Sequence, residues 1–533
     1  EDDYFVKFIG NNNKDGEGIW EECPQPERKI DFDDGSMPIQ MVREANGTFT
    51  VKQIDWAQCL VGDYDETTKL GSVPPPSFIT KKINKMLFYR NRLVLLSDEN
   101  INMSQPGEYF NFWPKSAITY TVDDNIDISV SSVFPAVIYD GIPTNSGLLL
   151  FTKTQQFLLS TDSDILSPAT AKVNSISTYN FNYKTNPISL GTTVGFLDNA
   201  GKYSRFWEMT NVLREGEPIV VEQTKVVNRL FDSEIAKISN SRENGVIFFS
   251  KKNSATLYGY KYFTSGERRV QQSWFTWELS GKIQHHAVLD DALYTVSRSI
   301  INDKSHTANG SATTFAAEFT IPSAAAITVE LDGVEETTGW SVSSNNVVFS
   351  SAPANGKVVR IYEHKDVMQR FALKVDDTGH FIEDNRGTTN DTTDDITYNI
   401  HLDNATAIAS SSLSAYDAAN NRTTFTLPTG FNDSSKQLAV IVIPTGSDTT
   451  FQGRTENVST FVTGGATKVS LTGNWKTYDP DEVEDGNTND DVTPTNNIIL
   501  GYLYDMQVQF PTIYHTKTVG NATRSDTRSS LVV

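Results

Sequence analysis

The stretch Leu148–Ser160, LLLFTKTQQFLLS, carries the pattern that decides the fold. Two apolar runs flank the short polar segment Lys153–Gln155, as expected for two antiparallel strands that are joined by a tight turn. The same pattern returns at Val194–Met209, VGFLDNAGKYSRFWEM, and in a longer form at Val246–Phe263, VIFFSKKNSATLYGYKYF. The chain is therefore predicted to be all-β, with strands that meander between neighbours.

Similar apolar runs extend on both sides of this stretch, from Phe78 to Ile301. Short polar turns separate several of them, such as Arg90-Asn91-Arg92, Asp198–Gly201 and Thr264–Gly266. Meanders that recur every several tens of residues are typical of β-propeller blades, and a β-sandwich fits the local pattern equally well. Strands are predicted at Met86–Tyr89, Leu93–Leu96, Leu148–Thr152, Phe157–Leu159, Thr193–Leu197, Val246–Phe249, Leu257–Phe263, Trp274–Leu279, Ala287–Leu289 and Leu293–Val296.

Beyond Ile301 the composition changes, which indicates further domains. A compact β-module is predicted at His306–His364, with turns at Asp332-Gly333 and Pro353–Gly356, and it has the character of an insertion. The Asp-, Thr- and Asn-rich segment that follows contains the acidic stretch Asp479–Asp491, predicted to be a solvated loop. We expect five segments: a β-rich start at 1–77, the meander at 78–305, the inserted module at 306–365, a β-rich domain at 366–497, and returning strands at 498–533.

Composition excludes several classes of function. The chain has 533 residues, with 45 Lys and Arg against 66 Asp and Glu, so its net charge is 45 − 66 = −21. A protein that grips DNA offers Lys and Arg to the phosphates, so this balance argues against a DNA-binding surface. The two cysteines cannot build a disulfide framework or a four-cysteine zinc site. No apolar stretch approaches the roughly 18 residues of a membrane span.

Motifs of enzymes and metal sites are missing or weak. No glycine-rich phosphate loop and no Gly-x-Ser-x-Gly elbow occurs, so no nucleotide cofactor is expected. His285 and His286 are adjacent, and neighbours on a strand face opposite sides and cannot share a metal. Asn11–Glu22, NNNKDGEGIWEE, matches a calcium loop in part, but the flanking residues Tyr4–Ile9 and Gly18–Trp20 are predicted strands, which favours a β-hairpin.

Two further signals are explained by composition. Asp123, Asp124, Asp127 and the pair Asp290-Asp291 supply close carboxylates of the kind that glycosidases use, yet 66 acidic residues produce such pairs by chance. Nine Asn-x-Ser/Thr sequons, including those at Asn46, Asn309, Asn404 and Asn521, arise in any chain this rich in Asn and Thr. The chain opens without Met on a predicted strand, and we expect it to be a piece of a longer polypeptide.

One block is more specific than these patterns: Leu87–Pro114, LFYRNRLVLLSDENINMSQPGEYFNFWP, followed by DDNIDISVS at Asp123–Ser131. It resembles the nozzle protein, or tail tubular protein B, of short-tailed bacteriophages of the autographivirus type. Gly259–Leu279, GYKYFTSGERRVQQSWFTWEL, resembles a second segment of that family, and Phe510–Tyr514 resembles a later strand. The residues that carry the resemblance are Arg90, Asn91, Arg92, Leu93, Glu99, Asn100, Tyr109, Phe110, Asn111, Phe112, Gln271, Gln272, Ser273, Trp274 and Trp277.

The resemblance implies a structural virion protein and not an enzyme. Its members form a hexameric ring in the phage tail, below an adaptor ring and beside the tail fibres, through which the genome leaves. The implied fold is a β-propeller platform with further β-domains that build the tube wall and tip. The segment His306–His364 instead resembles a module near the start of phage tail fibres, and we expect a β-sandwich-like surface domain that projects sideways.

The residues of the first block are expected to stabilise the fold and not to form an active site. Leu87, Phe88, Leu93, Leu95, Phe110, Phe112 and Trp113 have the spacing of a sheet core. Arg90 and Arg92 flank a turn on one side of the hairpin, where their donors can hold carboxylates or carbonyl groups, as a local brace or as a subunit contact.

Two other functions are compatible with the sequence, besides that of a subunit of a phage tail tube. One is an extracellular β-propeller enzyme that degrades polysaccharide, and the other is an adhesion module. In a DNA-conducting tube, acidic groups in the lumen would repel phosphate.

Overall fold

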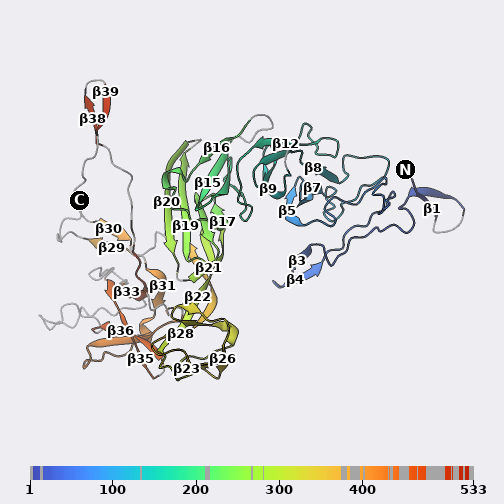
Figure 1. Ribbon diagram of the computed structural model, residues 1–533. Helices are drawn as coiled ribbons and strands as arrows, with labels where there is room; N and C mark the ends of the chain where they lie inside the picture. Colours follow the sequence, from blue (N-terminus) through green and yellow to red (C-terminus); the bar gives the residue numbers. More distant parts are fainter. Residues whose placement is uncertain are drawn as a thin grey trace. The chain divides into compact units, whose positions relative to one another are not determined.

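The structure is a computed structural model that consists almost entirely of antiparallel β-sheets (Figure 1). Helical structure in its described part is limited to single 3-10 turns such as Lys225–Val227 and Ala324–Ala326. The all-β prediction is therefore confirmed. The structure describes residues 4–11, 16–132, 135–210, 217–265, 268–279, 281–373, 381–384, 396–399, 402–429, 431, 436–442, 455–464, 466–473, 475, 498–505, 507, 515–519 and 522–526.

The chain divides into two compact units. Unit 1 comprises Glu1–Ser299 and Asp366–Lys374, and unit 2 comprises Ile300–Lys365 and Val375–Val533. The long strands β22 (Ala292–Thr307) and β28 (Val358–Ala372) carry the chain from one unit to the other and back. In the part of the chain that is described, no helix is long and apolar enough to cross a membrane.

Four sheets of unit 1 share one design, in which four consecutive strands pair as an antiparallel meander. In each sheet the first strand lies at one edge and the fourth at the other. The first sheet contains β5 (Ile83–Tyr89), β6 (Arg92–Ser97), β7 (Asn100–Met103) and β8 (Ile126–Ser129). The others are β9 (Ile138–Thr144), β10 (Gly147–Thr152), β11 (Gln156–Thr161) and β12 (Ala171–Ser177); β13 (Ile188–Ser189), β14 (Val194–Ala200), β15 (Tyr203–Thr210) and β16 (Ile219–Glu222); and β17 (Ile235–Ser241), β18 (Val246–Lys251), β19 (Thr256–Ser265) and β20 (Arg268–Glu278).

First strands of successive sheets contact one another: β5 meets β9, β13 meets β17, and β17 meets β21 (Gly281–Leu289). In unit 1, β21 pairs with β22, from Gly281↔Ser299 to Leu289↔Ala292. Two separate hairpins precede the sheets. One consists of β1 (Val6–Gly10) and β2 (Gly18–Glu22), and the other of β3 (Ile39–Arg43) and β4 (Phe49–Gln53).

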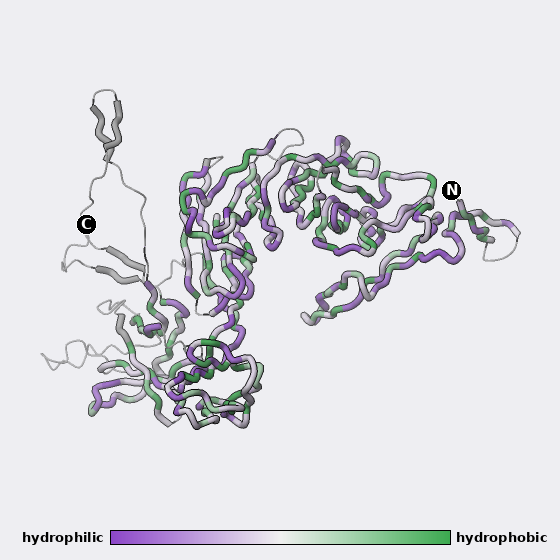
Figure 2. Tube along the Cα trace, viewed as in Figure 1, coloured by the Kyte–Doolittle hydropathy of each residue, from purple (hydrophilic) through white to green (hydrophobic). Residues whose placement is uncertain are grey.

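Apolar cores lie between consecutive sheets, which explains the continuous apolar runs in the sequence. In β10, Leu148 and Leu150 belong to the core between the first and second sheets, whereas Leu149 and Phe151 belong to the core between the second and third. Side chains alternate between the two faces of a strand, so a strand that is covered on both faces has to be apolar throughout. Figure 2 shows hydrophobic residues along these central strands.

Two details of the meander differ from the sequence prediction. The predicted turn Asp198–Gly201 is shorter, because β14 continues to Ala200 and pairs it with Tyr203. Phe88 was expected in the sheet core, but its side chain is 62% exposed, whereas Leu93, Leu95, Phe112 and Trp113 of the same set are buried. Alternation correctly places Phe88 on the face of Leu93, but the covering layer of unit 1 does not reach it.

Unit 2 begins with a small module that has its own core. Its strands are β23 (Thr314–Ala316), β24 (Ile327–Leu331), β25 (Val334–Glu335), β26 (Trp340–Ser343) and β27 (Asn346–Phe349), with the first half of β28. Val329, Val347 and Ile361 from different strands are fully buried together. The predicted turn Asp332-Gly333 is confirmed, since both residues have positive φ, at 51° and 80°, as a two-residue hairpin turn requires.

A second core in unit 2 lies between two further sheets. One contains β31 (Asp403–Ile408), β37 (Ile498–Tyr502), β33 (Leu438–Val442) and β34 (Thr455–Asn457), and the other contains β32 (Arg422–Thr426), β36 (Ala466–Thr472) and β35 (Ser459–Thr463). The hairpins β29 (Phe381–Asp384) with β30 (Ile396–Asn399), and β38 (His515–Val519) with β39 (Ala522–Asp526), complete the described strands. The predicted acidic loop at 479–491 and the motif at 510–514 lie outside the described residues.

Candidate functional site

The family residues Arg90–Leu93 form the hairpin turn between β5 and β6 and the start of β6. Arg90 and Asn91 both have positive φ, at 46° and 59°, which is the geometry of a two-residue turn matched to the twist of the strands. The Asn91 side-chain oxygen accepts a hydrogen bond from the Tyr109 hydroxyl at 2.8 Å, and its carbonyl accepts one from the Gly107 N–H at 2.9 Å. The turn is thereby tied to the loop after β7.

Arg92 is the largest of the fully buried side chains in this region, with 2% of its surface exposed. Its Nη1 donates to the carbonyl oxygens of Ser104 at 2.7 Å and Asp124 at 2.5 Å, and its Nη2 donates to those of Val122 at 3.2 Å and Leu166 at 3.4 Å. Burial lowers the pKa of Arg92, because the charged guanidinium loses hydration. One side chain thus joins β6 to three loops.

Arg90 behaves differently from Arg92 although it lies two residues away. Its side chain is exposed, and Nη1 donates to the carbonyl oxygen of Asp164 at 3.4 Å. Both arginines therefore reach the segment 164–166, and both find carbonyl groups there. Their predicted use in a subunit contact stays a prediction.

The other family residues of the first block support the same loop. Phe112 is buried and packs against Trp56 and Phe78, with ring centroids 6.1 and 5.4 Å apart, and Phe110 packs against Trp56 at 5.5 Å. The side-chain oxygen of Asn111 accepts a hydrogen bond from the Trp113 N–H at 3.1 Å. Glu99 accepts from the Val130 N–H through its carbonyl, and Asn100 opens β7 opposite Ser129.

The second block lies on β20, at the edge of the fourth sheet. Trp274 packs against Tyr260 with centroids 4.4 Å apart and against Phe231 at 5.1 Å, while Trp277 lies 5.6 Å from Phe248 on the opposite face. The exposed Gln272 accepts a hydrogen bond from the Tyr260 hydroxyl at 2.7 Å. Gln271 and Ser273 are exposed. The structure thus brings each block together locally, on different sheets.

An ion pair between β20 and β15, with a buried carboxylate and a partly buried guanidinium, was not predicted. Arg269 donates to both carboxylate oxygens of Glu208 on β15, at 2.5 and 2.8 Å. Thr193 and Gln223 also donate to this carboxylate, at 2.7 and 2.9 Å. Burial raises the pKa of the neighbouring Tyr260 to about 12. The only signal in the sequence was a glutamate between two large apolar residues, Trp207 and Met209, and a single strand does not show which cation lies opposite.

The candidate carboxylates accept hydrogen bonds from main-chain and side-chain donors of neighbouring segments. Asp124 is buried and accepts hydrogen bonds from the N–H groups of Lys115 at 2.9 Å and Thr121 at 2.6 Å. Asp127 accepts from the N–H of Ser77 at 2.7 Å. Asp291 accepts from the Asn244 side chain at 2.9 Å. These carboxylates are therefore occupied by the chain's own donors.

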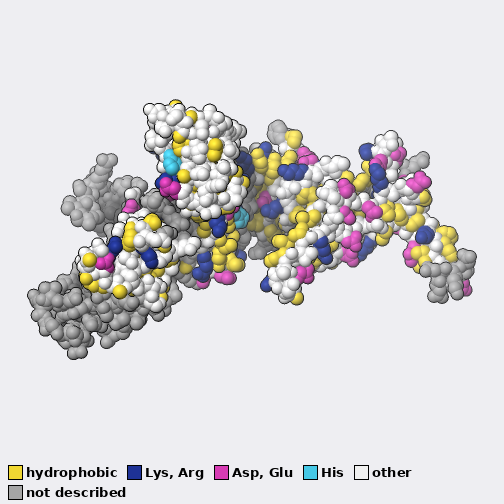
Figure 3. Space-filling view, turned by 90° about the horizontal axis from the view of Figure 1, so that it is seen from below, with side chains coloured by type: hydrophobic (Ala, Val, Ile, Leu, Met, Phe, Trp, Pro, Cys, Tyr) yellow, Lys and Arg dark blue, Asp and Glu magenta, His cyan; other side chains and the backbone are white. Residues whose placement is uncertain are grey.

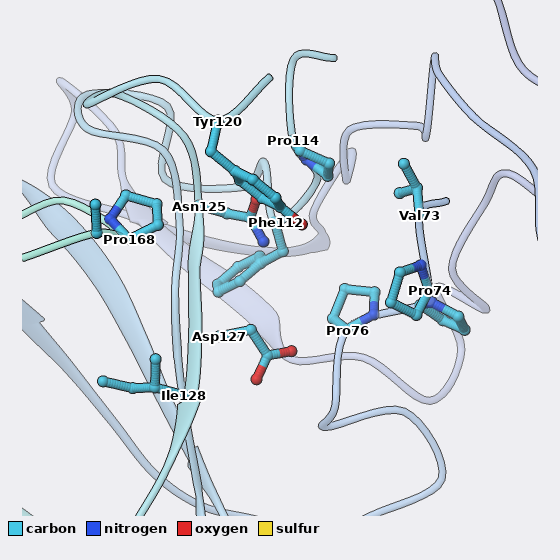
Figure 4. Close-up of a pocket in the computed structure, with 12 residues that line it drawn as sticks. Val73, Pro74, Pro76, Phe112, Pro114, Tyr120, Asn125, Asp127, Ile128 and Pro168 are labelled. Atoms are coloured by element: carbon cyan, nitrogen blue, oxygen red, sulfur yellow. The ribbon is translucent and has the colours of Figure 1, made fainter. Parts of the chain in front are cut away.

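A cavity of about 360 Å³ lies beside Asp127 (Figure 4). Its ionisable lining residues are Asp127 and Tyr120 only, and a glycosidase needs two carboxyl groups across a cleft. Proline, aromatic and aliphatic side chains dominate the rest of the wall: Val73, Pro74, Pro75, Pro76, Phe112, Pro114, Ile128, Pro168 and Ala169. The lining matches an apolar contact surface better than a reaction centre.

The candidate metal ligands are placed apart. His286 is buried and His285 exposed, as predicted for neighbours on a strand. The Nδ1 atom of His286 lies 2.6 Å from the Ser239 hydroxyl, and burial lowers its pKa to about 3. The calcium-like segment is the hairpin β1–β2, as expected, and its residues 12–15 lie outside the described part. Across the described residues, no group of three His, Cys, Asp or Glu side chains could hold a metal ion.

Comparison with known proteins decides the family. The family model described as "Bacteriophage nozzle protein" matches residues 1–347. The chain belongs to the bacteriophage nozzle protein family. This nozzle-family chain is 27% identical over 317 residues to "Tail tubular protein gp12" of Escherichia phage T7, a match that covers 56% of the chain and 38% of the relative. The match therefore spans about two fifths of that relative's length.

Membership makes this nozzle-family chain a structural component of a phage tail and of the virion, not an enzyme. The family match reaches residue 347 and so enters the segment 306–365 that was expected to be an insertion.

Among solved structures, similarity is low. Hsv2 of Kluyveromyces lactis is 9% identical with a TM-score of 0.27, covering 46% of the chain and 61% of Hsv2. PorZ of Porphyromonas gingivalis is 13% identical with a TM-score of 0.25, covering 52% of the chain and 35% of PorZ.

Proposed function

We propose that this chain is the repeating subunit of a ring, a hexamer, that forms the tail nozzle, closes it before infection, and conducts the phage genome during ejection. The observation that carries the proposal is the family match over residues 1–347, together with the kinship to a tail tubular protein. A channel built from identical subunits needs a rigid body that repeats around an axis. The sheets of unit 1 supply such a body.

The platform of this ring is a β-propeller formed by residues 78–305. Four meander sheets follow one another, their first strands are in contact at three places, and apolar cores fill the spaces between consecutive sheets. A propeller arranges its blades in this way, with the first strand of each blade near the axis. The buried pair Glu208–Arg269 joins the third and fourth sheets and fixes their spacing.

The remaining segments take the other roles of the nozzle. Residues 366–497 build the tube wall and tip, and residues 498–533 return to the platform or the tube. The module at 306–365 projects sideways toward the tail fibres, and the adaptor protein lies above the ring. The separate cores of unit 2 support this division, because each can fold around its own apolar cluster.

DNA passes through this tube without sequence-specific binding. The net charge of −21 supports the idea that the lumen repels phosphate and so keeps friction low. A lumen that is lined with Lys and Arg in the assembled ring would contradict this part of the proposal.

Electron microscopy of the purified chain tests the proposal directly. We expect closed rings with sixfold symmetry and an open or plugged axial channel. A chain that stays monomeric at micromolar concentration, or particles without a channel, would overturn it. Deletion of residues 306–365 is expected to leave the rings intact, and loss of the rings would contradict the lateral role of that module.

A further inference from the structure

The hairpin β3–β4 is amphipathic, and its apolar face is uncovered. Register pairs Met41 with Val51 and Arg43 with Phe49, so Ile39, Met41, Phe49 and Val51 lie on one face. These four side chains are between 59% and 68% exposed. The opposite face carries the polar residues Gln40, Thr50 and Lys52 and one apolar residue, the half-buried Val42. We call Ile39, Met41, Phe49 and Val51 the hairpin face.

Such a face requires a partner. Alternation of apolar and polar residues is typical of a strand that is half buried, and an isolated two-stranded hairpin is only marginally stable in water. Among the strands that the structure describes, β3 and β4 pair only with each other (Figure 1). Figure 3 shows hydrophobic side chains exposed at many places on the side seen from below.

A second apolar surface lies on the first sheet. Met86 pairs with Leu95 and Phe88 with Leu93, so these residues share a face of the sheet. Ile54, Trp56, Phe78 and Phe112 cover Leu93 and Leu95 on that face. Met86 and Phe88 lie beyond this cover and are 46% and 62% exposed. The Tyr109 ring packs against the edge of Phe88, with centroids 5.2 Å apart. We call Met86, Phe88 and Tyr109 the sheet notch.

Charges at the ends of the two surfaces are complementary. Arg43 lies at the end of the hairpin face opposite Phe49, and Glu108 precedes Tyr109 in the sheet notch. Neither side chain forms an ion pair with any residue that the structure describes. If the hairpin face packed against the sheet notch, Arg43 would lie beside Glu108, and each charge would gain an ion-pair partner.

The occupant is therefore a second copy of this chain. Both surfaces are exposed, and among the residues that the structure describes they are not in contact with each other. In a ring, each subunit contacts its neighbour through two different patches, and the contact closes after a full turn. Two complementary apolar surfaces on one chain are what such a contact needs.

We propose that the hairpin face of one subunit packs into the sheet notch of the next subunit, with Arg43 beside Glu108 of the partner subunit. This inference rests on the proposed function, because it assigns a contact to the proposed ring. It also gives a reason why Phe88 and Tyr109, of the family block, remain exposed in a single chain.

Crosslinking between different chains tests the contact. Two variants, Met41→Cys and Phe88→Cys, are prepared in a Cys23→Ser background, while the buried Cys59 is left in place. A short bismaleimide is expected to produce crosslinked dimers only when the two variants are mixed before assembly. Each variant alone serves as the control. Rings that form without any crosslink in the mixture would overturn this inference while leaving the proposed function intact.

Charge reversal provides a second readout. Arg43→Glu and Glu108→Arg are each expected to weaken ring assembly about fivefold, and the double variant is expected to restore it. Lys52→Glu, on the polar face of the same hairpin, is the matched control and should leave assembly unchanged. Failure of the double variant to recover would overturn the pairing. A wild-type chain that forms no rings would overturn the proposed function itself.

Discussion

The Arg92 guanidinium donates a hydrogen bond to the main-chain carbonyl oxygen of Asp124 at 2.5 Å. The same guanidinium holds the carbonyl oxygen of Ser104 at 2.7 Å. A buried carbonyl without a donor costs about 1–3 kcal/mol, so this side chain stabilises two strand-to-loop junctions at once.

Replacement of Arg92 by Gln is expected to lower the free energy of unfolding of unit 1 by about 3 kcal/mol, since the shorter side chain cannot reach the four carbonyls. Urea unfolding followed by tryptophan fluorescence measures the change. Arg90→Gln, at the exposed neighbour, should change stability by less than about 0.5 kcal/mol. Equal effects of the two variants would contradict the assigned difference.

The ion pair between Glu208 and Arg269 is expected to contribute to the stability of unit 1. Arg269→Met leaves the buried carboxylate without its cation and is expected to destabilise unit 1 by about 3–5 kcal/mol. The double variant Glu208→Met with Arg269→Met should recover most of this loss, because no uncompensated charge then remains. A double-mutant cycle in urea measures the coupling, and additive effects would argue against a shared buried pair.

Stability in acid should depend on His286. The folded state lowers its pKa from 6.5 to about 3, so the imidazole contributes stability above pH 6.5 that is lost as pH falls toward 3. In this window the free energy of unfolding should fall by about 1.4 kcal/mol per pH unit. His286→Gln should flatten the dependence in urea unfolding between pH 7 and 4. His285→Gln, at the exposed neighbour, should leave the steep slope in place.

Gly259 makes room for an aromatic ring. A Cβ atom at Gly259 would clash with the ring of Phe275, its register partner on β20. Gly259→Ala is therefore expected to destabilise the fourth sheet by about 1–3 kcal/mol. Adding Phe275→Leu to this variant should recover part of the loss, because the smaller side chain can move aside. Unfolding in urea checks both variants, and an unaffected Gly259→Ala would refute the close packing.

Local features of the fold were predictable from the sequence. Period-two alternation and turn residues act between neighbours in the chain, so the hairpins at Arg90-Asn91 and Asp332-Gly333 follow from short segments. The weak, polar edge strands were missed: β12, AKVNSIS, has no apolar run, because its outer positions face solvent. The two blocks that resemble the family were also evident in the sequence, because each is a contiguous segment of the chain.

Sequence alone thus determined that the chain is all-β, where its main hairpins turn, and to which family it is similar. Tertiary structure decided which side chains meet. The sequence of an apolar strand does not show how many of its side chains are covered by other segments, so the exposure of Phe88 could not be predicted. The sequence also does not show which side chains on distant strands form an ion pair, as Glu208 and Arg269 do although they lie 61 residues apart. Hairpins are set by local backbone geometry, whereas burial and ion pairing depend on the packing of whole sheets.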